Sequence, residues 1–171
     1  LALNQRLPED IRVQSSEEVA ADWHPRKHRC IKTYEYKIMN RRIEMPTQRF
    51  YSHFCYFHLD LDQMCRAADI LTGEHDFKSF CSVRTQVTDT VRTIYSIEVK
   101  RDEEDMIRIR VTGSGFLYNM VRILAGTLCE VGAGRMQPDA IPGILASRDR
   151  SQAGPTLPAK GLFLEKVDYD L

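Results

Sequence analysis

Positive charge and one indole gather in a short stretch near the start of the chain. The stretch consists of Trp23, His24, Pro25, Arg26, Lys27, His28, Arg29 and Lys32. Cations beside an aromatic ring suit a nucleic acid, because the cations pair with phosphates while a base stacks on the ring. A solvated basic loop has the same composition. From these residues alone the two interpretations are equally good.

Tyr34 is the second candidate, within the alternating segment Lys32-Thr33-Tyr34-Glu35-Tyr36. A tyrosine on a strand that borders a cleft can stack on a nucleobase and offer its hydroxyl. A half-buried tyrosine of a sheet is the commoner explanation of such a residue.

Arg122 is the third candidate, because it interrupts an apolar segment that runs from Phe116 to Leu128. A guanidinium beside the core needs an acidic partner. Such a pair can keep a catalytic carboxylate ionised and correctly aimed. The alternative is an Arg122 side chain that points to solvent.

Other motifs predict no further chemistry. Gly113-Ser114-Gly115 lacks the Lys-Ser/Thr of a P-loop and the third glycine of a dinucleotide site, so it predicts a tight turn. The five histidines show no metal-ligand spacing, and no G-x-S-x-G is present. Five widely spaced cysteines without C-x-x-C indicate free thiols in a reducing compartment.

The elements that position these residues follow from hydrophobic periodicity. We expect helices at 60–72 (capped by Asp60 and stopped by Gly73), 116–131 and 139–147. We expect strands at 30–39 (with one face lining a cleft), 90–101, 105–112 and 161–169, and a short strand followed by a polar turn within 11–20. Because no regular βαβ repeat occurs, the predicted fold is α+β, with a mainly antiparallel sheet and helices on one face.

Composition limits the classes of protein that fit. With 171 residues and 43% hydrophobic residues, one ordinary core is expected. Lys plus Arg equal Asp plus Glu at 24 each, which argues against a histone-like charge but leaves a local basic patch open. Neither a membrane-spanning stretch nor a signal peptide is visible, so we expect a soluble protein.

Several segments of the chain form a joint pattern in a fixed order. They are Asp22-Trp23-His24-Pro25-Arg26, Lys32-Thr33-Tyr34-Glu35-Tyr36, Gly73-Glu74-His75-Asp76-Phe77-Lys78-Ser79-Phe80, the segment from Gly113 to Leu128 with Glu130-Val131-Gly132, and Asp149-Arg150, Ala153-Gly154-Pro155-Thr156, Pro158-Ala159 and Gly161-Leu162-Phe163-Leu164. Taken together, these segments resemble the bacterial tRNA pseudouridine synthase A family, and the resemblance covers about residues 3–170.

The resemblance implies a pseudouridine-synthase-like fold and a cytoplasmic homodimer that isomerises uridine in the anticodon stem-loop of tRNA, without cofactor or metal. An aspartate attacks the nucleoside, and the base detaches, turns and reattaches through carbon. Tyr34 would stack near the target base, and Arg122 would pair with the aspartate. The implied RNA contacts are Trp23, His24, Pro25, Arg26, Lys27, Arg42, Arg84, Thr85, Gln86, Val87 and Thr88.

One departure concerns the nucleophile. The family's R-T-D-x-G-V-H motif has no counterpart here, since neither Arg84-Thr85-Gln86 nor Val87-Thr88-Asp89 matches it. The chain also begins at Leu1 without Met. We therefore expect a C-terminal portion whose N-terminal domain is absent and which is inactive alone. Residues 1–28 would form a connecting segment with the basic tRNA-contact loop, and residues 29–171 a catalytic-support domain.

Two other functions remain open at this point. A non-catalytic RNA-binding or dimerisation module would have the same cleft but would never meet an aspartate. An α+β domain without an RNA role would show no salt-dependent affinity for tRNA. An upstream R-T-D-x-G in the same reading frame separates the enzyme from the module.

Overall fold

The computed structural model describes residues 2–25, 27–82 and 87–169. The chain divides into two units after Arg29: residues 1–29 with 169–171 form one, and Cys30–Asp168 form the other. No helix in the described part of the chain is long and apolar enough to cross a membrane.

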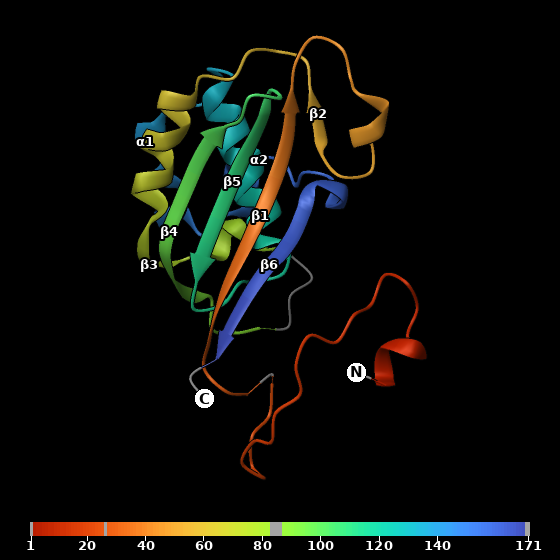
Figure 1. Ribbon diagram of the computed structural model, residues 1–171. Coiled ribbons are helices and arrows are strands. Elements are labelled where there is room, and N and C mark those ends of the chain that lie inside the picture. Colours follow the sequence, from red (N-terminus) through yellow and green to blue (C-terminus); the bar gives the residue numbers. More distant parts are fainter. Residues whose placement is uncertain (1, 26, 83–86, 170–171) are drawn as a thin grey trace. The chain divides into compact units, whose positions relative to one another are not determined.

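The larger unit is built on a six-stranded sheet (Figure 1). Its strands are β1 (Cys30–Asn40), β2 (His53–Cys55), β3 (Gly73–Asp76), β4 (Val91–Arg101), β5 (Met106–Gly113) and β6 (Leu162–Tyr169). The order is β2-β1-β5-β4-β3, and β6 also pairs with β1. The β1–β5, β4–β5 and β3–β4 pairs are antiparallel and β1–β2 is parallel, so the sheet is mainly antiparallel, as predicted.

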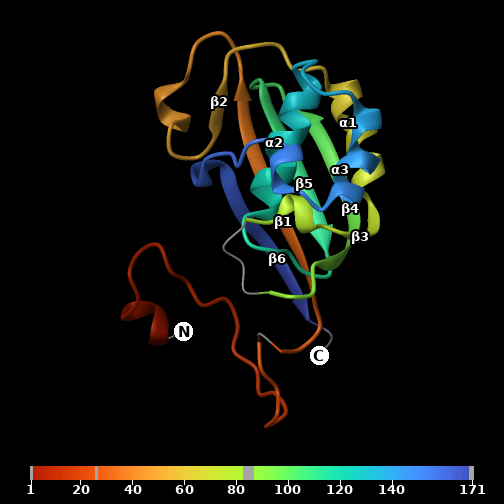
Figure 2. The same ribbon diagram turned by 180° about the vertical axis from the view of Figure 1, so that it is seen from behind.

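Three α-helices cover one face of this sheet (Figure 2). They are α1 (Leu61–Leu71), α2 (Met120–Gly132) and α3 (Ile141–Ser147). The predicted cap of α1 is present, because the Asp60 carboxylate accepts a hydrogen bond from Gln63 N at 3.1 Å. The core lies between helices and sheet, and includes the fully buried Tyr36, Ile109 and Leu124. The α+β class predicted from the sequence is confirmed.

The opposite face of the sheet carries charged side chains instead of helices. Arg108 donates to Glu35 and Asp102, with N–O distances of 3.0 and 3.1 Å. Burial raises the pKa of the Asp102 carboxyl, but hydrogen bonds from Met106 N and Arg108 outweigh burial and lower that pKa overall. A hollow of about 160 Å³ on this face is lined by Glu35, Glu98, Lys100, Arg108 and Arg110. The predicted polar face of β1 therefore lines a hollow in which acids and bases neutralise each other.

The longest predicted helix begins later than its apolar pattern suggests. Residues 116–119 lie outside α2, because Asn119 adopts a left-handed conformation with φ of 62° just before the first turn. Asparagine tolerates this conformation better than most side chains. The apolar residues Phe116 and Leu117 belong to the turn after β5, where they pack against the core.

The smaller unit corrects one prediction. Residues 11–20 form no strand, since they have no partner strand and their alternation ends in the polar run Gln14-Ser15-Ser16-Glu17-Glu18. An aromatic contact orders the unit: Trp23 stacks on His28 at 5.8 Å between ring centroids, and meets Tyr169 edge-on at 5.3 Å. The Tyr169 hydroxyl donates to Pro25 O at 3.0 Å.

All five cysteines are free thiols, as predicted. Cys129 is deeply buried, and burial raises the pKa of its thiol to about 12. A thiol with this pKa stays protonated at neutral pH, so Cys129 is an inert core residue.

Candidate functional site

Tyr34 opens into a cavity of about 240 Å³ in the larger unit. Its ring meets Phe116 edge-on, with centroids 5.2 Å apart and planes at 86°. β1 supplies Tyr34, the turn after β5 supplies Phe116, and the start of β6 supplies Leu162. The remaining lining residues come from the turn and the start of α2: Leu117, Tyr118, Asn119, Met120 and Val121. The cavity therefore offers aromatic and apolar walls of a size that suits a planar base.

Arg122 lies next to this cavity, one residue beyond Val121 in α2. Its Nε donates to Leu157 O at 2.6 Å and its Nη1 donates to Asn119 Oδ1 at 2.9 Å. Among the described residues, no carboxylate lies within ion-pair distance of this half-buried guanidinium. The described chain thus satisfies Arg122 with neutral oxygens, and the acidic partner expected for a buried arginine is not among them.

Asn119 connects the cavity to Arg122. Its Oδ1 accepts from the guanidinium, while its Nδ2 donates to Ser82 Oγ at 2.9 Å. The left-handed backbone of Asn119 aims the amide in this direction. Reasoning from the sequence missed this residue, because an asparagine near the start of an apolar segment carries no motif of its own.

A segment that we call the strap (residues 153–161) fixes Arg122 from the other side. Gly154 N donates to Thr127 Oγ1 at 2.9 Å, and the Tyr36 hydroxyl donates to Pro158 O at 2.7 Å. The strap passes so close to α2 that a Cβ at Gly126 would lie 1.9 Å from Pro155 O. Burial raises the pKa of Tyr36 far above its usual value, so this hydroxyl keeps its proton and remains a donor.

The predicted RNA contacts are spread over both units. Trp23, His24, Pro25 and Lys27 lie in the smaller unit. Arg42 is exposed after β1, and Val87 and Thr88 are exposed before β4. Arg26, Arg84, Thr85 and Gln86 lie outside the described residues. Of the predicted site residues, Tyr34 and Arg122 come close together through Asn119. None of the predicted RNA contacts that the structure describes lines the Tyr34 cavity.

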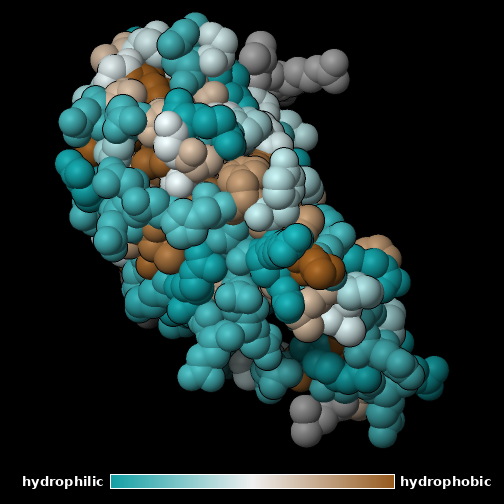
Figure 3. Space-filling view, turned by 90° about the horizontal axis from the view of Figure 1, so that it is seen from above, coloured by the Kyte–Doolittle hydropathy of each residue, from teal (hydrophilic) through white to brown (hydrophobic). Residues whose placement is uncertain are grey.

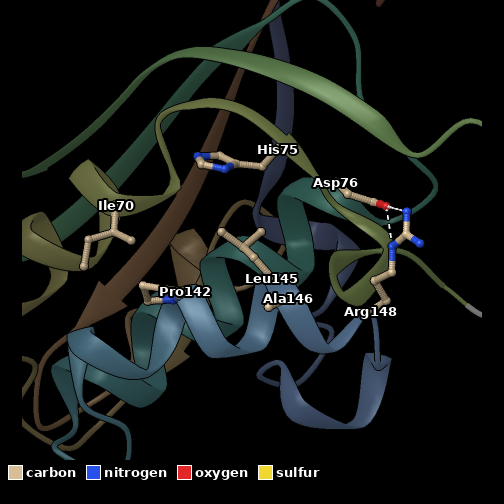
Figure 4. Close-up of a pocket in the computed structure, with 7 residues that line it drawn as sticks. All are labelled: Ile70, His75, Asp76, Pro142, Leu145, Ala146 and Arg148. Atoms are coloured by element: carbon tan, nitrogen blue, oxygen red, sulfur yellow. Dashed lines mark hydrogen bonds and ion pairs between the residues drawn. The ribbon is translucent and has the colours of Figure 1, made fainter.

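A second hollow, of about 420 Å³, lies between α3, β3 and the end of α1 (Figure 4). Its walls are mostly apolar, from Ile70, Pro142, Leu145 and Ala146. At its edge, Asp76 forms an ion pair with Arg148 and accepts a hydrogen bond from the Thr90 hydroxyl at 2.5 Å. Because its charged groups bind each other, this hollow offers little to a polar substrate.

The residues that the structure describes form no obvious metal-binding site. No group of three or more His, Cys, Asp or Glu side chains there is placed to hold an ion.

Comparison with known proteins identifies the class of protein to which this chain belongs. The sheet, its single layer of helices and the Tyr34 cavity suggest the same class. Residues 67–170 match the family of tRNA pseudouridine synthases. The chain is 49% identical over 170 residues to tRNA pseudouridine synthase A of Bacillus pumilus, covering 99% of this chain and 68% of the relative. Identity to tRNA pseudouridine synthase A of Geobacillus kaustophilus is 45%, covering 99% and 65%.

A third relative, tRNA pseudouridine synthase A 2 of Clostridium tetani, is 46% identical over 99% of this chain and 68% of its own length. The chain thus spans about two thirds of the length of these relatives. It belongs to the tRNA pseudouridine synthase family, which confirms the resemblance stated from the sequence.

Proposed function

We propose that this chain forms part of an enzyme that isomerises uridine to pseudouridine in the anticodon stem-loop of tRNA. The observation that carries this proposal is the aromatic cavity of Tyr34 with the Arg122 guanidinium beside it, in a member of this family.

Tyr34 is the proposed platform for the target base. An enzyme that acts on a base must take it out of the stack, and an aromatic wall repays part of the lost stacking. The Tyr34 ring is already fixed by its edge-on contact with Phe116. Little ordering is therefore needed when a base enters, which favours binding.

Arg122 is the proposed counter-ion of the attacking aspartate. Leu157 O and Asn119 Oδ1 accept hydrogen bonds from two of its nitrogens. The guanidinium therefore has a fixed orientation before a carboxylate binds. A guanidinium lowers the pKa of a nearby carboxyl and aims its oxygens through paired hydrogen bonds. Both effects favour nucleophilic attack at neutral pH.

The reaction balances without a co-reactant. The carboxylate attacks the nucleoside, the carbon–nitrogen bond to the base breaks, and the base turns. A carbon–carbon bond then forms as the bond to the carboxylate breaks, the proton at that base carbon leaves, and the detached ring nitrogen takes up a proton. Product and substrate have the same composition, so the step needs no oxidant or reductant.

The aspartate itself must come from residues outside this sequence, because R-T-D-x-G does not occur in it. We expect the 171-residue chain alone to be inactive. Residues 1–28 would then serve as a connecting segment with a basic tRNA-contact loop, and residues 29–171 as the catalytic-support domain. The proposed RNA contacts are those in the stretch from Trp23 to Lys27, Arg42 and the stretch from Arg84 to Thr88, in a cytoplasmic homodimer.

Tritium release from tRNA labelled at C5 of uridine tests this proposal, since C5 loses its hydrogen when the new bond forms. The enzyme that includes this chain and an R-T-D-x-G segment should release tritium, and the 171-residue chain should not. Turnover by the chain alone would overturn the assignment of the nucleophile. Affinity for tRNA without any turnover by the larger enzyme would instead indicate a non-catalytic RNA-binding module.

A further inference from the structure

We propose that the segment between β1 and β2, which we call the arginine–aromatic segment (residues 41–51), is a second RNA-binding surface that stacks an unpaired base. The inference rests on the proposed function, because it names tRNA as the ligand. It adds a surface separate from the Tyr34 cavity, since none of its residues lines that cavity.

Exposed apolar and aromatic side chains make this segment unusual. Ile43, Phe50 and Tyr51 are 72%, 64% and 56% exposed, and they lie within nine residues of one another. A single exposed apolar side chain is common, but a group of them marks a binding surface. Seen from above, this side of the molecule shows small hydrophobic areas among hydrophilic residues (Figure 3).

Charge distinguishes an RNA partner from a protein partner. The segment carries Arg41, Arg42 and Arg49 against the single acid Glu44, which lies 3.9 Å from Lys160. The Arg49 guanidinium sits over the Phe50 ring, 4.3 Å from its centroid. Exposed rings interleaved with arginines are the composition of surfaces that bind single-stranded nucleic acid, where bases stack and phosphates pair with cations.

The segment has a fixed conformation. Its short 3-10 turn, Pro46–Gln48, is closed by a hydrogen bond from Arg49 Nη1 to Pro46 O at 2.9 Å. At its base, Asn40 Nδ2 donates to Cys55 O and Phe57 O at 3.1 and 2.7 Å. Because these bonds order the segment in advance, binding costs little conformational entropy.

Position along β1 separates this surface from the proposed active site. Asn40, the residue just before the segment, is six residues beyond Tyr34 in the same strand, which is roughly 20 Å along β1 at about 3.3 Å per residue. The strand that follows the segment, β2, pairs with β1 from Ile38 onward, also beyond Tyr34. One tRNA is long enough to touch both, so the segment can hold RNA away from the reacting base and contribute to affinity rather than to chemistry.

The test compares two double variants with two matched controls in the enzyme that includes this chain. F50A/Y51A removes the rings, and R42Q/R49Q removes two cations. The controls are Tyr95→Ala, another tyrosine about half exposed, on β4, and Arg66→Gln, an exposed arginine on α1. Fluorescence anisotropy with labelled tRNA gives affinity over a series of salt concentrations. Thermal unfolding verifies that each variant is folded.

F50A/Y51A should weaken tRNA binding on the order of tenfold, as expected for one lost stacked base. R42Q/R49Q should reduce the slope of log affinity against log salt by roughly 1.5. Both variants should raise KM and leave kcat nearly unchanged, and both controls should match the wild type.

Two results would overturn the inference while leaving the proposed isomerisation of uridine in tRNA intact. In one, the wild type binds and modifies tRNA and both double variants behave identically to it. In the other, F50A/Y51A changes the oligomeric state in light scattering, which assigns the segment to a second copy of the chain. Failure of the wild type to bind tRNA at low salt would instead reject the proposed function and this inference together.

Discussion

Arg122 and Leu157 bind each other through two hydrogen bonds, although 35 residues separate them in sequence. The Arg122 guanidinium donates to Leu157 O at 2.6 Å, and Leu157 N donates to Arg122 O at 3.3 Å. The strap is thereby tied to both the backbone and the side chain of one residue of α2. The direction of the guanidinium consequently depends on the strap staying in place.

Replacing Gly126 with alanine should displace the strap. The new Cβ would meet Pro155 O at 1.9 Å, a contact that only movement of the backbone can relieve. We expect a loss of about 2 kcal/mol or more in unfolding free energy and a lower kcat, because Arg122 loses its alignment. Urea denaturation and tritium release measure the two effects.

Gly143 provides the matched control. It lies in α3, and a Cβ there would meet nothing within 4 Å. Gly143→Ala should leave activity unchanged and increase stability by up to about 1 kcal/mol, because alanine favours the helix. Equal effects of the two glycine variants would show that the close approach of the strap to α2 contributes to neither stability nor activity.

Tyr36→Phe should loosen the strap more gently. It removes the bond from the hydroxyl to Pro158 O and leaves that carbonyl unpaired. The expected cost is about 1 kcal/mol of stability. If Tyr36 also positions Arg122 through the strap, kcat should fall several-fold while KM for tRNA stays the same. A stable variant with wild-type kcat would limit Tyr36 to a role in packing.

Asp76→Asn tests the acid sensitivity of the fold. Burial raises the pKa of Asp76, but hydrogen bonds from Thr90, Arg148 and Lys78 N outweigh it, so the pKa in the folded state lies below the usual value. The carboxylate therefore stabilises the fold above the usual pKa of aspartate, and this contribution disappears as the pH falls through the lowered pKa.

The asparagine variant should be about 1 kcal/mol less stable at pH 7, and its stability should depend less on pH between 5 and 3. Unfolding curves measured over that range give the comparison. Wild type and variant with parallel pH dependence would exclude Asp76 as a source of acid sensitivity.

Local patterns in the sequence were enough for most of the fold. Asp60 was predicted to cap α1, and the alternation of Met106–Val111 predicted a strand with Arg108 and Arg110 on its polar face; both are confirmed. Such features depend on neighbours within a few residues. The strand predicted within residues 11–20 is absent. A strand needs a neighbouring strand to pair with, and alternation of residue types does not show whether one is present.

The arrangement around Arg122 could not be derived in the same way. Its partner Leu157 is distant in sequence, and a carbonyl oxygen leaves no signature in residue type. The left-handed conformation of Asn119 likewise depends on the turn that precedes α2. Residue type and context made Tyr34 and Arg122 candidates, and the family resemblance supplied their expected roles. The structure adds the groups that hold Arg122 and the strap, namely Asn119, Leu157 and Tyr36.

A double-mutant cycle on tritium release tests most directly whether Tyr34 and Arg122 act on one uridine. The enzyme that includes this chain and an R-T-D-x-G segment is compared with its Tyr34→Leu, Arg122→Gln and double variants. Each single variant should lower kcat by a factor on the order of 100 or more, and the double variant should lose far less than the product of the two. Folded single variants that retain kcat within about threefold of the wild type would contradict the account.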